Sequence, residues 1–331
     1  MRRIKVHMEN VGSLREVYDI TPERVKTALE PYGDLADHLD IRIGTDSDFD
    51  EILQDTEVLY GSLMGRELPR DLLAKAPNLK WVNYIGAGID HLLPLNWLPE
   101  GAVLTKSSGA HMPIAAEYGL MGLFMLNNFV PAYTSNQREH KWERYFATPL
   151  QGKTLGVVGV GHIGAAIAGL ARQHGMKTLG VRRTAEGHPN IDEMFGPDGL
   201  DTVLQRSDFI VVGVASTEQT RGLIGQRELQ LLKPGAGIVS YARGDVIDWD
   251  ALREQLTNGH LSGAVVNGLP QEPLPESSPL WDTPNLVITQ HTGTQDDDQY
   301  MIQCLDILFR NMRRYIDGDQ LLFQSDPAIG Y

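Results

Sequence analysis

Short apolar runs alternate with amphipathic stretches along the first hundred residues of the chain. Apolar runs predict buried strands at residues 4–7, 58–63 and 79–85. Between the first two, Pro22–Leu29 is typical of a helix, with Thr21 as its N-cap and Pro22 at its first position. Such alternation predicts a parallel sheet covered by helices.

The pattern becomes sharper from residue 153 onwards. Strands are expected at residues 154–158, 178–181, 209–214, 237–241, 263–266 and 286–289. Helices are expected between them, at residues 165–174, where Gly175 ends the helix, and at 249–257. A glycine-rich loop, residues 159–164, separates the first of these strands from its helix. This order predicts a doubly wound nucleotide-binding domain.

Two further helical stretches shape the expected domain organisation. Residues 115–129 are apolar and predict a helix that carries Gly119 and Gly122. These small residues would permit close packing against another helix, such as one across a dimer interface. The alternative is an ordinary buried helix. Residues 296–315 form a helical tail that we expect to return to the first domain. We therefore expect an α/β protein with a discontinuous, flavodoxin-like substrate domain (1–106 and 295–331) and a Rossmann nucleotide-binding domain (107–294).

Composition narrows the classes of partner. The 331 residues suffice for two domains, and 42% hydrophobic and 22% charged residues are ordinary for a globular protein. The net charge of −14 argues against nucleic acid and anionic membranes as partners. It remains compatible with a small anionic substrate, because local cations outweigh a distant field.

The single cysteine and the N-terminus bear on the compartment. Cys304 cannot form an intrachain disulfide, which favours a reducing compartment, and we expect it to be a core thiol. The N-terminus enters an expected strand directly, without the apolar region of a signal peptide. The longest apolar run, residues 120–126, is too short to cross a bilayer. We expect a cytoplasmic protein.

The glycine loop has the spacing of a dinucleotide site. Gly159 allows the tight turn, Gly161 lets the backbone approach a pyrophosphate, and Gly164 lets the helix pack on the sheet. The N-terminus of the helix offers unpaired N–H groups to the phosphates. The alternative, a glycine-rich turn in an unrelated α/β protein, fits the strand–loop–helix context less well.

The end of the next strand bears on the choice of cofactor. NAD sites usually place an acidic residue there, but this chain has Arg182, Arg183 and Thr184. Two guanidinium groups attract a 2′-phosphate, and Thr184 offers a hydroxyl. We therefore expect NADP(H) to be preferred, with NAD(H) possible. The alternative is that the arginines simply face solvent.

Three polar residues supply the chemistry that reduction of a 2-oxo acid needs. His291 is the natural proton donor, and Glu272 beside it would favour the imidazolium and fix the ring. Arg243 can hold a carboxylate in a two-pronged contact and polarise the carbonyl. Each has an alternative: a surface pair for Arg243, a solvated loop for Glu272, a strand-end cap for His291. We expect no metal site.

The motifs together resemble the D-isomer-specific 2-hydroxyacid dehydrogenase family over nearly the whole chain. The resemblance rests on segments 86–90, 159–164, 242–248, 271–275, 279–281, 291–293 and 326–331. It implies the same roles for Arg243, Glu272 and His291, and a homodimer. It also implies that the turn at residues 86–88 binds the substrate carboxylate through Ala87 and Gly88 from the side facing Arg243. The remaining expected cofactor contacts are His162, Ile163, Val214, Ala242, Asn267 and Gly293.

Several positions depart from the family pattern. Asn267 replaces an Asp near the nicotinamide carboxamide, where its oxygen can still accept a hydrogen bond. The lost charge suggests a preference for NADPH and for reduction. Gln290 replaces a proline, Tyr241 replaces a small residue, and residues 268–270 differ from the usual turn. Candidate pocket residues are Ser62, Leu63, Tyr84 and Trp142.

The leading hypothesis is an NADP(H)-dependent reductase that gives a D-2-hydroxy acid. Glyoxylate or hydroxypyruvate is the first expectation for the substrate, and a bulkier aromatic or branched 2-oxo acid is the alternative. Oxidation of formate is disfavoured, because formate-type relatives carry Gln where this chain has Glu272. A nucleotide-sensing co-repressor on the same scaffold is the alternative from another class.

Overall fold

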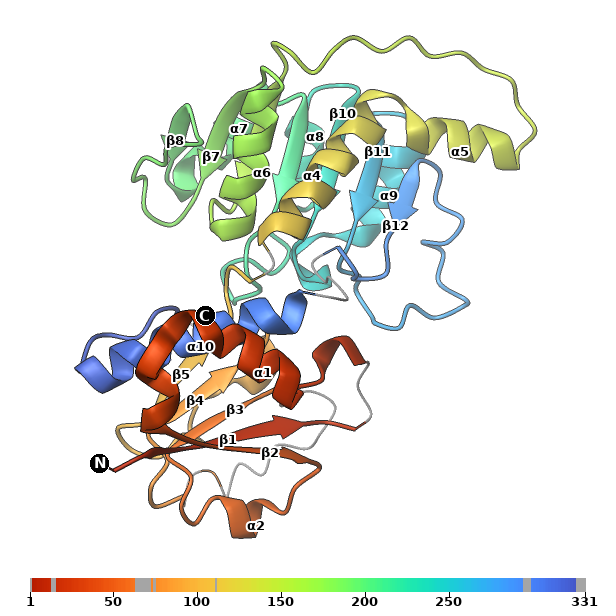
Figure 1. Ribbon diagram of the computed structural model, residues 1–331. Coiled ribbons are helices and arrows are strands. Elements are labelled where there is room, and N and C mark those ends of the chain that lie inside the picture. Colours follow the sequence, from red (N-terminus) through yellow and green to blue (C-terminus); the bar gives the residue numbers. More distant parts are fainter. Residues whose placement is uncertain are drawn as a thin grey trace. The chain divides into compact units, whose positions relative to one another are not determined.

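The computed structural model describes residues 2–12, 16–62, 73, 76–110, 112–293 and 299–325. The chain divides into two compact units (Figure 1). Unit 1 comprises Met1–Ala110 and Gln295–Tyr331, and unit 2 comprises His111–Thr294. Two chain segments far apart in the sequence therefore build unit 1. Which unit holds the substrate and which the cofactor stays a prediction.

A five-stranded parallel sheet forms the centre of unit 1. Its strands are β1 (Ile4–Asn10), β2 (Leu39–Thr45), β3 (Val58–Gly61), β4 (Trp81–Tyr84) and β5 (Val103–Lys106). They lie in the order β2-β1-β3-β4-β5 and pair in parallel. This is the flavodoxin-like order, as expected. Every residue of β3 and β4 is buried, which is why these strands appear in the sequence as continuous apolar runs.

Helices α1 (Pro22–Leu29) and α10 (Tyr300–Asp317) supply the core on one face of this sheet. Helix α1 has the expected bounds, and the Thr21 side chain accepts a hydrogen bond from the backbone N–H of Arg24 at 3.3 Å. Helix α10 carries Cys304, whose side chain is fully buried, so the expected core thiol is confirmed. The other face holds a cluster that includes Trp97 and α2 (Phe49–Ile52).

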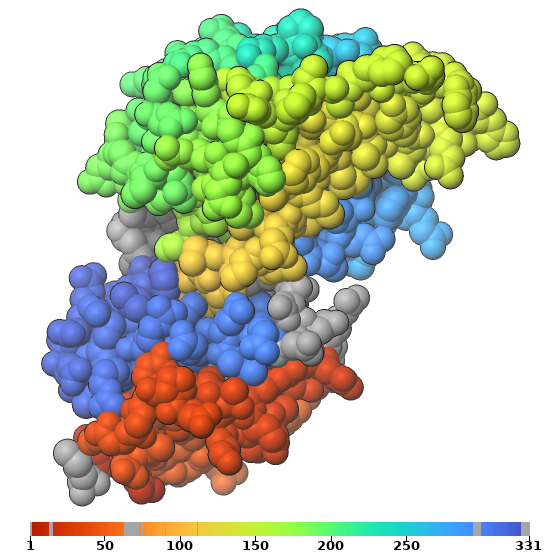
Figure 2. All heavy atoms as spheres, turned by 45° about the horizontal axis from the view of Figure 1, so that its top comes forward, coloured from red at the N-terminus to blue at the C-terminus, as the bar shows by residue number. Residues whose placement is uncertain are grey.

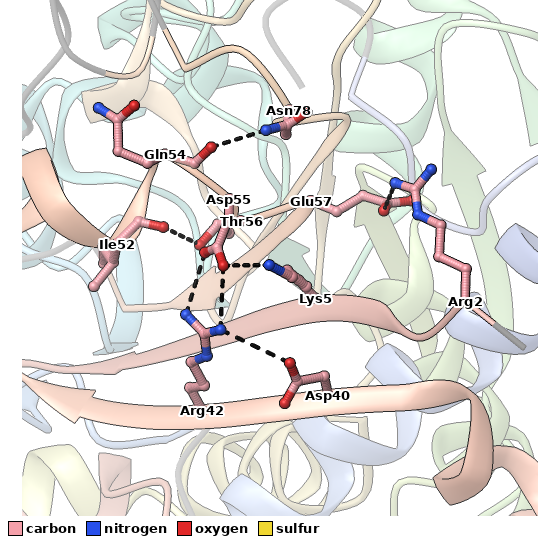
Figure 3. Close-up of polar contacts among 10 residues, drawn as sticks. All are labelled: Arg2, Lys5, Asp40, Arg42, Ile52, Gln54, Asp55, Thr56, Glu57 and Asn78. Atoms are coloured by element: carbon pink, nitrogen blue, oxygen red, sulfur yellow. Dashed lines mark hydrogen bonds and ion pairs between the residues drawn. The ribbon is translucent and has the colours of Figure 1, made fainter.

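A network of charges links β1 and β2 to the turn before β3 (Figure 3). Asp55 forms ion pairs with Lys5 of β1 and, at 3.2 Å, with Arg42 of β2. These cations hold the pKa of the Asp55 carboxyl below its usual range, chiefly through the hydrogen bond from Lys5. Next to it, Arg2 pairs with Glu57 at 2.7 Å. The network contributes to sheet assembly and holds no catalytic constellation.

Unit 2 is built on a seven-stranded parallel sheet. Its strands are β6 (Thr154–Val158), β7 (Lys177–Val181), β8 (Glu193–Phe195), β9 (Phe209–Val212), β10 (Ala236–Ser240), β11 (Leu261–Val266) and β12 (Leu286–Ile288). The order is β8-β7-β6-β9-β10-β11-β12. It reverses between β6 and β9, as in the Rossmann fold. In such sheets ligands bind outside the carboxyl ends of the strands at this reversal.

Helices cover both faces of this sheet (Figure 1). One face packs on α4 (Met112–Asn127) and α6 (His162–Gln173). The other packs on α7 (Leu200–Arg206), α8 (Gln226–Leu231) and α9 (Trp249–Thr257). Helix α9 and strand β6 have the expected bounds.

The first helix of unit 2 differs from its expectation in both bounds and packing. It spans Met112–Asn127 rather than 115–129, and Phe129 has a φ of 57°, which an α-helix does not accept. A Cβ on Gly119 would lie 2.5 Å from Ile167 of α6, and one on Gly122 would lie 2.9 Å from Val239 of β10. Both glycines therefore serve close packing within the chain, and Gly119 faces another helix, α6, as expected for a small residue. A role of α4 in a dimer interface stays a prediction.

Helix α5 (Val130–Arg138) and the segment that follows it lie on the outside of unit 2 (Figure 2). Trp142 in this segment is 93% exposed and Phe146 is 77% exposed. The suggestion that Trp142 lines a pocket is therefore wrong for the chain on its own. Among the helices that the structure describes, none has the length and apolar character needed to cross a bilayer.

Candidate active site

The glycine loop after β6 leaves no room for a side chain at two positions. Gly159 has a φ of +100°, and a Cβ there would lie 2.7 Å from the backbone nitrogen of Val214. A Cβ on Gly164 would lie 2.4 Å from the carbonyl oxygen of Gly159. These contacts bring the start of α6 against the loop and place the loop beside Val214.

Gly161 differs from the other two, because a Cβ there would meet no described heavy atom within 4 Å. It is the N-cap of α6, which begins at His162, three residues before the expected start. His162 and Ile163 thus form the first turn of the helix, His162 exposed and Ile163 half-buried. Open space at the N-terminus of a 12-residue helix fits the pyrophosphate of a dinucleotide.

Of the two arginines at the end of β7, Arg182 is not simply solvated. Arg182 Nε donates to the carbonyl and to the hydroxyl oxygen of Thr184, both at 3.1 Å. One Nη of Arg182 donates to the Glu186 carboxylate at 2.6 Å. Arg183 and Thr184 are exposed. The Glu186 contact was not predicted from the sequence, and the only signal available was its spacing of four residues from Arg182.

The loops after β10 and β11 are pressed against each other. A Cβ on Gly244 would lie 2.1 Å from the carbonyl oxygen of Leu269, and one on Gly268 would lie 2.4 Å from that of Ala242. The main chain on either side of Arg243 therefore touches the segment that leads to Glu272. Gly244 and Gly268 thus allow the two loops to approach closely, which brings the Arg243 and Glu272 side chains into one site.

Arg243, His291 and Glu272 form one chain of contacts. His291 Nδ1 lies 2.7 Å from Glu272 Oε2, and His291 Nε2 lies 3.3 Å from Arg243 Nη1. The other carboxylate oxygen, Oε1, accepts a hydrogen bond from the backbone N–H of Leu269 at 2.8 Å. About a third of the His291 side chain remains exposed, at 32%. The ring is thus fixed on one side by Glu272 and turns its other nitrogen toward a guanidinium.

The loop that carries His291 has a constrained backbone. Gln290 and His291 have φ angles of 54° and 57°, in the left-handed region. A proline at position 290 could not adopt this φ, since its ring fixes φ near −65°. The replacement of the family's proline by Gln290 therefore agrees with the backbone seen here. Strained backbone of this kind is common at functional sites.

Asn267 anchors this loop. Its Oδ1 accepts a hydrogen bond from the backbone N–H of Gly293 at 2.9 Å and a longer one from the Thr289 hydroxyl at 3.4 Å. The Thr289 hydroxyl has a nearer acceptor in the Val266 carbonyl oxygen, at 3.1 Å, so the hydrogen bond from Gly293 is the principal contact of the Asn267 oxygen. That Asn267 also contacts the nicotinamide carboxamide stays a prediction. The anchoring role of Asn267 could not be predicted from the sequence.

Tyr118 and Tyr241 pack on each other, and Tyr118 contacts the start of the loop that carries His291. The Tyr118 hydroxyl lies 2.5 Å from the Thr289 hydroxyl, and the two tyrosine rings meet edge to face at 4.8 Å. Burial raises the pKa of Tyr118 to about 12 and that of Tyr241 further, so both stay neutral. Tyr241 donates to the Ala115 carbonyl at 2.5 Å and thereby ties β10 to α4.

The expected substrate-binding turn lies in unit 1, after β4. A Cβ on Gly86 would lie 2.4 Å from the Tyr84 ring, and Ala87 and Gly88 are half-buried. Tyr84 and Ser62 are buried, with Tyr84 in the core, while Leu63 lies outside the described residues. That Ala87 and Gly88 face Arg243 stays a prediction.

The chain is similar to known proteins over this site. Residues 120–293 match a family model described as "D-isomer specific 2-hydroxyacid dehydrogenase, NAD binding domain". A glyoxylate reductase of Thermococcus litoralis is 30% identical over 70% of this chain and 73% of its own length. The D-3-phosphoglycerate dehydrogenase of Synechocystis sp. is 30% identical over 75% of this chain but only 46% of its own length. The chain thus spans about half the length of such relatives.

The similarity extends to complete solved structures. A D-isomer-specific 2-hydroxyacid dehydrogenase of Xanthobacter autotrophicus, solved in complex with NADPH and MES, has a TM-score of 0.83 and 28% identity. The similarity covers 100% of both chains. It therefore includes both units described above.

Proposed function

The chain belongs to the D-isomer-specific 2-hydroxyacid dehydrogenase family, and on this premise we propose that it catalyses the NADP(H)-dependent reduction of a 2-oxo acid to a D-2-hydroxy acid. The observation that carries the proposal is the contact chain from Arg243 through His291 to Glu272. It joins a carboxylate anchor to a proton donor whose orientation is fixed.

The positions of the ring nitrogens support a proton-transfer role for His291. Glu272 accepts from Nδ1, so the mobile proton belongs on Nε2. With Nε2 protonated, that nitrogen and the Arg243 guanidinium are both donors, only 3.3 Å apart. A substrate oxygen that accepts from both would satisfy them. The oxo oxygen of a 2-oxo acid fits this place, and its neighbouring carboxylate fits the same guanidinium.

The division of roles follows from this arrangement. Arg243 binds the carboxylate and withdraws charge from the carbonyl oxygen. His291 donates the proton to that oxygen, and Glu272 stabilises the imidazolium before the transfer. The reduced nicotinamide, when bound, would supply the hydride to C2 of the substrate. Asn267 acts as a positioning residue, because it holds the loop that carries His291.

The cofactor site is the loop of residues 159–164 with the end of β7. The open N-terminus of α6 takes the pyrophosphate, and Arg182 with Thr184 takes the 2′-phosphate. The NADPH in the Xanthobacter relative supports this assignment. NAD(H) is a weaker alternative cofactor, since it lacks the phosphate that Arg182 would bind.

The substrate we propose first is a small 2-oxo acid, glyoxylate or hydroxypyruvate, which the Thermococcus relative's name supports for glyoxylate. The test is oxidation of NADPH and, in parallel, NADH by the whole protein with 2-oxo acids from glyoxylate to phenylpyruvate. We expect turnover, faster with NADPH. Tight NADPH binding without turnover of any acid would contradict the proposal and favour a nucleotide-sensing role.

We also propose that the protein is a cytoplasmic homodimer. The outer face of α4 exposes Met121 (40%) and Phe124 (39%), and the segment after α5 exposes Trp142 (93%). Large apolar side chains exposed side by side on one helix face, as Met121 and Phe124 are, are typical of a contact with another molecule. Light scattering of the purified protein should give twice the chain mass of 36.7 kDa. A monomer at micromolar concentration would refute the dimer and leave the catalytic proposal intact.

A further inference from the structure

The guanidinium group of Arg182 is held by a carboxylate of its own chain. Glu186, four residues later, accepts a hydrogen bond from an Arg182 Nη at 2.6 Å. The Nε of the same group is fixed by Thr184. The main chain of Arg182 is fixed as well, because its N–H donates to the Phe195 carbonyl in β8 at 3.1 Å.

The two partners are differently placed. The Arg182 side chain is 26% exposed, whereas that of Glu186 is 76% exposed. The arginine is therefore set into the surface at the strand end, and the glutamate approaches it from the solvent. A phosphate of a bound nucleotide would reach the guanidinium from the same solvent side, since Nε already faces Thr184.

We propose that Glu186 weakens the preference for NADPH by occupying the place of the 2′-phosphate on Arg182. The proposal rests on the function proposed above. A 2′-phosphate that takes the place of Glu186 on this Nη breaks the Arg182–Glu186 contact, and the nearby carboxylate repels the incoming phosphate. Binding of NADH, which has no 2′-phosphate, leaves the pair intact. Glu186 thus lowers the preference for NADPH without removing it.

The size of the effect follows from the exposure of the pair. Ion pairs between exposed side chains contribute little, up to about 1 kcal/mol, which corresponds to about fivefold in affinity. Salt weakens such contacts, since the Debye length shrinks to about 3 Å at 1 M. The expected effect is therefore a few-fold change that diminishes as ionic strength rises.

The test compares Glu186→Gln with the wild-type protein. Glutamine keeps the shape and a hydrogen-bond acceptor but removes the charge. The matched control is Asp250→Asn, which removes one charge from another surface pair of unit 2, Arg253–Asp250 at 3.3 Å, where Asp250 is 94% exposed. Dissociation constants are measured by calorimetry for adenosine 2′,5′-bisphosphate and for 5′-AMP, at low and high salt.

We expect Glu186→Gln to bind adenosine 2′,5′-bisphosphate about fivefold more tightly than the wild type does, and 5′-AMP equally well. The control should match the wild type. Equal affinity for the bisphosphate in Glu186→Gln and wild type would overturn the inference while the nucleotide site stands. Weaker binding of 5′-AMP by Glu186→Gln would also overturn the inference, because Glu186 would then bind the ribose hydroxyl instead of competing with the 2′-phosphate. A wild type that binds neither nucleotide would overturn the proposed function as well.

Discussion

At the scale of single residues, one side-chain oxygen links a strand to the proposed proton donor. Asn267 ends up buried directly after β11, and its Oδ1 accepts from the backbone of Gly293, two residues beyond His291. The same oxygen also lies within 3.4 Å of the Thr289 hydroxyl, which in turn forms a hydrogen bond with the Tyr118 hydroxyl. The loop with two left-handed residues is thus held at both ends, so His291 keeps its distance to Glu272.

Removal of this oxygen should misplace the proton donor. We expect Asn267→Ala to lower kcat about tenfold or more, because small displacements of a catalytic group are costly. Asn267→Asp should restore most of kcat, since a carboxylate also accepts from Gly293. Steady-state kinetics with NADPH and the best 2-oxo acid would check both. If Asn267→Ala kept the wild-type kcat, the anchoring role would be refuted.

Cys304 offers a residue-scale prediction that depends on pH. Burial raises the pKa of its thiol to about 12, so the thiolate that reacts with thiol reagents is scarce in the folded protein at pH 8. We expect no labelling by a disulfide reagent at pH 8 until urea unfolds the chain. A raised pKa also means that any stability from the neutral thiol is complete below about pH 8.5 and is lost as pH rises toward 12. Rapid stoichiometric labelling of the native protein would contradict this.

At the scale of elements, capped helices and apolar strands were predictable, and contacts between loops were not. Thr21 with Pro22 and the flanks of residues 249–257 mark helix ends, and α1 and α9 have the predicted bounds. The start of α6 was missed because His162 to Gly164 lie inside the glycine motif, although they form the first helical turn. The ends of β9 and α4 were also mispredicted, because apolar residues continue beyond the ends of both elements.

In the proposed active site, too, some features were predictable from the sequence and others were not. The chemistry of the residue types and the resemblance identified Arg243, Glu272 and His291, which the structure brings together. The Arg182–Glu186 pair and the Asn267 anchor depend on rotamers and on loops that fold back. No periodicity in the sequence encodes those. The side-chain contacts therefore required three-dimensional structure.

Gly244 gives the element-scale prediction. A Cβ there would lie 2.1 Å from the Leu269 carbonyl, which is backbone and cannot move aside cheaply. We expect Gly244→Ala to lower the free energy of unfolding by about 1–3 kcal/mol and to separate Arg243 from the Glu272 loop, with loss of turnover. Urea unfolding measures the change in the free energy of unfolding, and steady-state kinetics measure the loss of turnover. Gly196→Ala is the control, because no described atom lies within 4 Å of its Cβ. Equal stability of both variants would contradict the packing argument.

At the scale of the whole molecule, the strand order decides where chemistry can occur. The sheet of unit 2 reverses between β6 and β9, and the glycine loop follows β6 at that point. Arg182 and Arg243 lie after other strands of the same sheet, so their positive charges gather at its carboxyl edge. A chain with a net charge of −14 thereby presents cations locally to an anionic cofactor and substrate.

Cofactor binding should therefore stabilise the folded protein. A ligand that binds only the native state at about 100 times its dissociation constant adds about 2.7 kcal/mol to the free energy of unfolding. We expect NADPH to raise Tm more than NADH does at equal concentration, and Arg182→Asp to remove that difference. Differential scanning fluorimetry measures both. If Arg182→Asp lowered the shifts for the two cofactors equally, Arg182 would not bind the 2′-phosphate.

The most direct test of the proton-transfer account is the rate of NADPH oxidation by His291→Asn with the best 2-oxo acid, alongside the dissociation constant for NADPH. General acid catalysis is worth about 100-fold to 10,000-fold, so the variant should lose at least about 100-fold in kcat. Its affinity for NADPH should match that of the wild type, since no contact proposed for the phosphates involves His291. A wild-type rate in His291→Asn would contradict the account.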